Sequence, residues 1–143
     1  MSSTTPFLTW LIRLAGWGAG GVFIYAGALK VGDPLAFADS VASFRLLPVV
    51  LINPVALILP VFEVLVGLSL VVGVRRRACA MMIAVMCGFF AVALIQALAR
   101  GIEVDCGCFG GGVPSTVKTV WALGRDLILG ALAWWVALRA PKT

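Results

Sequence analysis

The 143-residue sequence contains no histidine and few charged residues. Lys, Arg, Asp and Glu make up 12% of it, about half the share in a soluble domain, whereas hydrophobic residues make up 62%. The absence of histidine excludes imidazole acid–base catalysis and histidine metal sites. The shortage of charge excludes an ordinary soluble enzyme, a disordered tail and a nucleic-acid-binding domain. We therefore interpret the net charge of +5 as a signal of membrane orientation.

The sequence has instead four long apolar stretches. They cover about residues 7–29, 54–74, 78–99 and 119–138, and each is close to the roughly 20 residues that a helix needs to cross a bilayer. Continuous apolar runs of this length favour helices over membrane strands, in which apolar and polar residues alternate. We predict an all-α membrane protein in which residues 1–143 form a single domain of four transmembrane helices.

The connection between the first two stretches contains a short amphipathic segment. Phe37, Val41 and Phe44 are spaced i, i+4 and i+7, which places them on one face of a helix. We expect a short interfacial helix there, across the mouth of the bundle. A loop with one helical turn is the alternative.

Basic residues predict the orientation of the bundle. Arg75, Arg76 and Arg77 form a cluster in the short second connection, and such clusters stay in the cytoplasm. This cluster places both termini in the cytoplasm and the third connection on the outer, oxidising side. Counted together, the Lys and Arg residues divide almost evenly, six inside and five outside, so the cluster decides the prediction.

The third connection carries a pair of cysteines separated by one glycine. Cys106, Gly107 and Cys108 are followed by Phe109 and then by three glycines. The two Cα atoms of such a pair lie at most about 7 Å apart, near the upper limit for a disulfide, and Gly107 can adopt the dihedral angles that bring the sulfurs together. The small ring would be strained, and strained, accessible disulfides exchange readily. We therefore predict that Cys106 and Cys108 are a catalytic thiol–disulfide pair.

Two other interpretations of this pair remain open. Cys106 and Cys108 could hold a soft metal such as Cu(I), Zn or Hg, which would make the protein a metal carrier or permease. Alternatively, a static disulfide could fix the loop of a non-catalytic membrane assembly factor. Cys79 and Cys87 are too far apart along one predicted helix for a mutual disulfide, and we expect them to pack as small apolar residues.

Charged residues within the apolar stretches indicate a second site. Glu63 lies inside the second stretch, where an ionisable group costs at least about 2.5 kcal/mol unless it is paired or faces a cavity. Arg125 and Lys30 are its expected partners, and the three residues would form a polar pocket beneath the cysteine pair that biases thiol ionisation. The alternative is an ion pair that only fixes the helices. Asp126 should point to a different helix face from Arg125, about 100° around the axis.

Over nearly its whole length, the chain resembles the MauE/DoxX family of small four-helix membrane proteins. The resemblance rests on motifs in the first two apolar stretches and, most specifically, on the cysteine loop, which is similar to the MauE branch. These motifs occupy residues 13–14, 20–30, 44–48, 60–63 and 105–110, together with Gly67 and Arg125–Asp126.

This resemblance implies a bundle of the kind also seen in vitamin K epoxide reductase-like proteins, and a role in periplasmic thiol–disulfide handling. In the MauE branch, that role supports disulfide formation in methylamine dehydrogenase. The implied location is a bacterial inner membrane. The implied partners are the lipid bilayer and a periplasmic thiol or disulfide client or thioredoxin-like protein, not nucleic acid. No cofactor is identified. A quinone is the open alternative, although the chain departs from the epoxide reductase pattern in having no CxxC at a helix end to contact one, which argues against a quinone-linked electron path.

Overall fold

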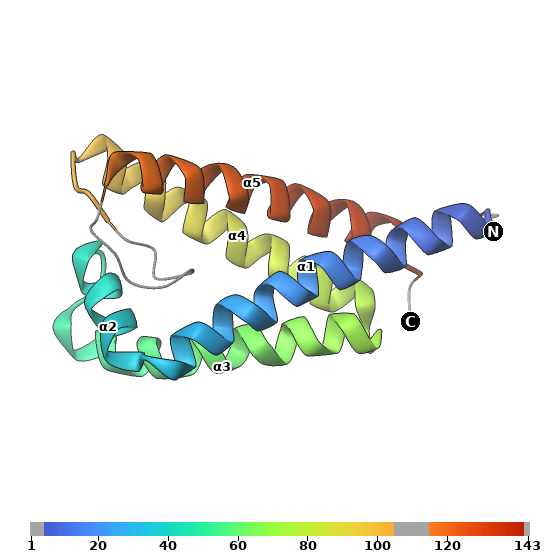
Figure 1. Cartoon of the computed structure of the whole chain (residues 1–143), viewed down its shortest axis with the longest axis horizontal. Helices are drawn as coiled ribbons and strands as arrows, with labels where there is room; N and C mark the ends of the chain where they lie inside the picture. The colour runs from blue at the N-terminus through green and yellow to red at the C-terminus, as the bar shows by residue number, and fades with distance from the viewer. Residues whose placement is uncertain (1–4, 105–114, 142–143) are drawn as a thin grey trace.

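The computed structural model describes residues 5–104 and 115–141, and all the regular secondary structure within these ranges is helical. The helices are α1 (Pro6–Gly32), α2 (Pro34–Ser43), α3 (Val49–Val72), α4 (Arg76–Ala99) and α5 (Thr116–Arg139) (Figure 1). All but α2 are long and apolar enough to cross a membrane. The predicted all-α, four-span membrane bundle is therefore confirmed, as is a short helix between the first two spans.

Capping residues mark the ends of several of these helices. Asp33 caps α2 by accepting a hydrogen bond from the backbone N–H of Ala36 at 3.1 Å. Ser115 caps α5 in the same way through the N–H of Lys118 at 3.3 Å. Gly73 ends α3 in the left-handed conformation, with φ of 89°, which glycine adopts without steric cost.

The second span begins earlier than the predicted boundary at about residue 54. Helix α3 starts at Val49, so Pro54 and Pro60 both lie inside it. Prolines are tolerated within membrane helices because neighbouring helices and local adjustments satisfy the freed backbone groups. Proline is therefore a weaker boundary signal here than in a soluble helix.

The bundle is built from two helix pairs. Helix α1 packs along α3, and α4 packs along α5, whereas contacts between the two pairs are fewer (Figure 1). Helix α2 packs mainly on α3 and lies at the end of the bundle where the two pairs diverge (Figure 1).

The buried core reflects this division. One apolar cluster is shared by all four long helices and includes Ile12, Leu70, Ile83 and Val136. At the α2 end, by contrast, each pair has a small cluster of its own. Those clusters are Phe37, Ala38 and Ala56 on α2 and α3, and Leu94, Ala97, Val104 and Ala122 around α4 and α5. The two pairs thus share one core at one end, whereas at the α2 end the described residues form separate clusters.

Glycines allow α1 and α3 to approach closely. A Cβ atom built on Gly20 would lie 2.8 Å from the carbonyl oxygen of Gly67, and one built on Gly67 would lie 2.7 Å from that of Gly20. A Cβ atom at Gly27 would lie 2.9 Å from the carbonyl oxygen of Pro60. Only glycine fits these positions without movement of the backbone, so the α1–α3 distance depends on them.

Candidate functional site

The first component of the site is an ion pair between α1 and α3. Lys30, in the last turn of α1, places its Nζ 2.8 and 2.9 Å from the two carboxylate oxygens of Glu63. Both residues are 2% exposed. The close approach of the two helices at Gly27 and Pro60 brings them into range. Of the two partners expected for Glu63, the structure therefore places Lys30 directly against it.

The Lys30 ammonium also contacts two aromatic rings. Its Nζ lies 4.9 Å from the centre of the Phe37 ring on α2 and 5.2 Å from that of Phe90 on α4. A desolvated cation at this distance from a ring face is attracted by the ring quadrupole. Lys30 thus connects α1 to α2, α3 and α4.

The second component is an ion pair on α5. Arg125 donates from Nε and Nη2 to Oδ1 of Asp126 at 3.1 and 2.8 Å. Asp126 is buried. We expected Asp126 to point to a different helix face from Arg125, and this difference does not prevent the two side chains from meeting. The two Cα–Cβ directions do differ by about 100°, but the long arginine side chain curves back along the helix to reach its neighbour. Sequence reasoning missed Asp126 as a site residue, although a second acidic group within an apolar span was an available signal.

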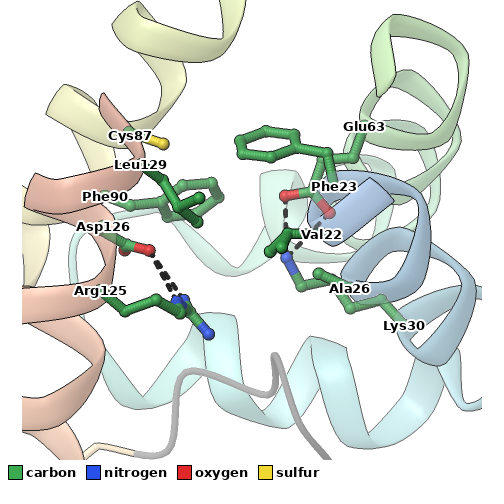
Figure 2. Close-up of a pocket in the computed structure, with 10 residues that line it drawn as sticks. All are labelled: Val22, Phe23, Ala26, Lys30, Glu63, Cys87, Phe90, Arg125, Asp126 and Leu129. Carbon is green, nitrogen blue, oxygen red and sulfur yellow. Dashed lines mark hydrogen bonds and ion pairs between the residues drawn. The ribbon is translucent and has the colours of Figure 1, made fainter. Parts of the chain in front are cut away.

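Both ion pairs line one small cavity between the helix pairs (Figure 2). Its volume is about 20 Å³, enough for about one water molecule. Two cations and two anions face it, so their formal charges cancel. The lining residues are Val22, Phe23, Ala26, Lys30, Glu63, Cys87, Phe90, Arg125, Asp126 and Leu129. The structure thus brings Glu63, Lys30 and Arg125 to one cavity, and each helix pair supplies a complete ion pair.

Neither membrane-embedded cysteine forms a disulfide, as predicted. Cys87 packs in the core cluster shared by the four long helices, and its side chain also lines the cavity (Figure 2). Cys79 lies in the first turn of α4, where its Sγ donates to the carbonyl oxygen of Val74 at 3.5 Å. Cys87 therefore combines the predicted packing role with a position beside the charged groups.

The predicted redox residues Cys106, Gly107, Cys108 and Phe109 lie outside the described residues. The chain leading to them is described and is firmly anchored. Val104 is fully buried, and its carbonyl oxygen lies 3.1 Å from Oγ1 of Thr119, whose single hydroxyl proton it shares with the carbonyl oxygen of Ser115, also at 3.1 Å.

A second hydrogen bond fastens the same segment to α5. Oγ1 of Thr116 donates to Oε1 of Glu103 at 3.1 Å. Both contacts lie at the end of the bundle that also carries α2 (Figure 1). The described start of the cysteine loop is thus attached to the first turns of α5.

Comparison with known proteins assigns the chain to a family. The model of the family described as "Methylamine utilisation protein MauE" matches residues 8–139. The chain belongs to the MauE family. Within the family, it is similar to the "Methylamine utilization protein MauE" of Paracoccus denitrificans, with 34% identity over 137 residues, which cover 95% of this chain and 72% of that protein. No solved structure matches the chain.

The predicted MauE-like resemblance is therefore confirmed. The range matched by the MauE family model contains the four charged residues of the cavity and both cysteines of the loop. The family assignment consequently bears on both candidate sites.

Proposed function

We propose that this MauE-family protein acts in methylamine utilisation as a bacterial inner-membrane protein that exchanges disulfides with a partner protein through Cys106 and Cys108. The family description and the name of the Paracoccus relative both refer to methylamine utilisation. The CxC pair supports the exchange chemistry, because a small strained ring reacts readily with an incoming thiolate.

The observation that supports the proposal is the attachment to α5 of residues 103–104, which directly precede the loop. Thr119 binds the carbonyl of Val104, the second residue before Cys106, and Arg125 follows Thr119 on the same helix. Six residues of helix correspond to about 9 Å along the axis. A segment fixed at this distance from a buried charged cavity is suited to presenting a reactive pair in a defined place.

In the direction of disulfide formation, the exchange has two steps. A thiolate of the partner attacks one sulfur of the Cys106–Cys108 disulfide, which breaks that bond and forms a mixed disulfide. The partner's second thiolate then attacks the mixed disulfide. The partner leaves with a new disulfide, and two electrons remain on Cys106 and Cys108, which become thiols by taking up the two protons that the partner's thiols released.

A redox titration of the cysteine pair tests the proposal. The purified protein, with Cys79 and Cys87 replaced by serine, is equilibrated at defined glutathione or dithiothreitol potentials and alkylated, and its mass is measured by mass spectrometry. A midpoint between about −120 and −270 mV, the range of exchange catalysts, is expected.

Two other results would overturn disulfide exchange. A midpoint below about −300 mV would mark a structural bond and favour the assembly factor. A pair that never oxidises and retains Cu(I) would favour metal transfer. In the exchange mechanism, single replacements at Cys106 or Cys108 trap the partner as a mixed disulfide, and full activity in both replacements would contradict it.

A further inference from the structure

The charged cavity adjoins a second, larger and mostly apolar cavity. Phe90 and Asp126 line both. The second cavity has a volume of about 100 Å³ and lies between α2, α3 and α4, where the two helix pairs diverge. Apolar cavities of about 150 Å³ bind benzene, and this one has about two thirds of that volume, so it suits a short stretch of chain or a ring that extends partly toward the lipid. The two cavities are therefore neighbours, one lined by the four charged residues and the other almost entirely by apolar side chains.

The apolar cavity opens where the protein faces lipid. Phe89 and Leu46 line the cavity and are 71% and 40% exposed. In a membrane bundle, exposed apolar residues of this kind contact acyl chains. A molecule dissolved in the lipid phase can therefore reach the cavity from the side, between α2 and α4.

The charged cavity favours a neutral group that can donate a hydrogen bond. The two cations and two anions balance, so a charged head would add an uncompensated charge to a buried space. Among the described residues, both hydrogen bonds to Asp126 end on Oδ1. A carboxylate accepts at both oxygens, which leaves Oδ2 with capacity for a hydroxyl donor. A hydroxyl also accepts, and the guanidinium of Arg125 lines the same cavity as a donor.

We propose that these neighbouring cavities together bind a neutral, membrane-soluble amphiphile with a hydroxyl head, which donates to Asp126 while its apolar ring or chain lies among Phe37, Phe44 and Phe90. The shared chemistry is an alcohol or phenol with an apolar tail. The aromatic side chains that line the apolar cavity favour a planar ring, since offset and edge-to-face contacts between rings add to simple burial. This binding site is independent of the cysteine chemistry.

Thermal unfolding of the full chain in detergent micelles, followed by circular dichroism, tests the proposal. The probe is 4-pentylphenol, compared with pentylbenzene, which lacks the hydroxyl, and with the anion 4-pentylbenzoate. We expect saturable stabilisation by the phenol at a concentration at least tenfold lower than for either comparison molecule. A parallel measurement with 1-octanol shows whether the site prefers a chain alcohol or a ring alcohol, and a preference for either one supports a ligand with a hydroxyl head.

A matched pair of substitutions on α4 locates the site. Ala93 is buried and lines the apolar cavity, whereas Ala78 is exposed near the other end of the helix. Ala93→Leu fills the cavity and should abolish stabilisation by the phenol, and Ala78→Leu should retain it. Where Ala93→Leu does not fold, Asp126→Asn replaces it. That variant should bind the phenol about tenfold more weakly, and pentylbenzene unchanged, because a hydrogen bond to a charged acceptor is the stronger one.

Four results would overturn the proposal. They are equal stabilisation by pentylbenzene, tighter binding of 4-pentylbenzoate, no saturable stabilisation of the wild type, and full stabilisation of Ala93→Leu. The same measurements on the protein with Cys106→Ala and Cys108→Ala should be unchanged. Failure of disulfide exchange would therefore not affect the result.

Discussion

Replacing Glu63 alone is expected to destabilise the bundle far more than replacing Glu63 and Lys30 together. The two side chains are 3% and 1% exposed, and the ammonium lies within 2.9 Å of both carboxylate oxygens. Glu63→Leu removes the carboxylate that holds the buried Lys30 cation. The double substitution Lys30→Met with Glu63→Leu removes both charges and approximately keeps both volumes.

The magnitudes follow from the burial of the pair. Removing one partner of a buried ion pair costs about 3–5 kcal/mol, whereas well-packed apolar replacements of both are often neutral. Lys30→Met also loses the attraction to Phe37 and Phe90, worth up to about 2 kcal/mol for a desolvated cation. The methionine sulfur recovers about 0.3–1.5 kcal/mol at the same rings. The double variant should therefore lie within about 2 kcal/mol of the wild type, and the coupling energy should be about 3 kcal/mol or more.

The free energy of unfolding can be measured by titrating the protein in mixed micelles with sodium dodecyl sulfate and following helix content by circular dichroism. The wild type, both single variants and the double variant complete the cycle. The reasoning is refuted when both single variants stay within about 1 kcal/mol of the wild type, or when the double variant is as unstable as the sum of the singles.

Three further predictions concern helix packing, orientation and the loop anchor. In the same titration, Gly67→Ala should lower the free energy of unfolding by about 1–3 kcal/mol, because its Cβ would lie 2.7 Å from a carbonyl oxygen of α1. The control Gly88→Ala should not destabilise the protein, because the space around Gly88 is open. In intact spheroplasts treated with a reductant, a membrane-impermeant maleimide should label Cys106 and Cys108 but not a cysteine placed at Arg75. The two membrane-embedded cysteines are replaced by serine for this test, and the reverse pattern would invert the proposed orientation. Thr119→Val removes the hydrogen bond to the carbonyl of Val104, just before the cysteine loop. Alkylation of reduced Cys106 should become several-fold faster, because a hydrogen bond worth about 1 kcal/mol no longer restrains the segment. An unchanged rate would show that this bond does not restrain the loop.

The spans could be predicted from the sequence because membrane helices carry a long and nearly continuous apolar signal. The short helix α2 was also predictable, from the spacing of Phe37 and Val41 and from the proline that follows Asp33. The start of α3 was harder to predict from the sequence. Pro54 marks a boundary in a soluble helix, but inside a membrane bundle the helix continues through it.

The charged residues show where sequence reasoning reaches its limit. Hydropathy gives the depth of Glu63 but not which helix lies beside it. The choice of Lys30 over Arg125 depends on the close packing of α1 and α3 at Gly27, and that contact is a property of the folded bundle. The pairing of Arg125 with Asp126 was missed for another reason. A helical wheel records the direction of each Cα–Cβ bond and takes no account of how far a flexible side chain can reach.

The division of the charges between the two helix pairs limits what the cavity can do to a nearby thiol. Lys30 and Glu63 neutralise each other on one side, and Arg125 and Asp126 do so on the other. Beyond a few ångströms the field of a tight ion pair is that of a dipole, which falls off faster than the field of a single charge. The intact cavity should therefore influence the cysteine pair mainly through shape and hydrogen bonding. Removal of one charge would expose its partner's field, so Glu63→Leu should shift the redox midpoint of Cys106 and Cys108 more than the charge-free double variant does. If the two variants shifted it equally, the electrostatic contribution of the pair would be negligible and the cavity would act on the loop through packing alone.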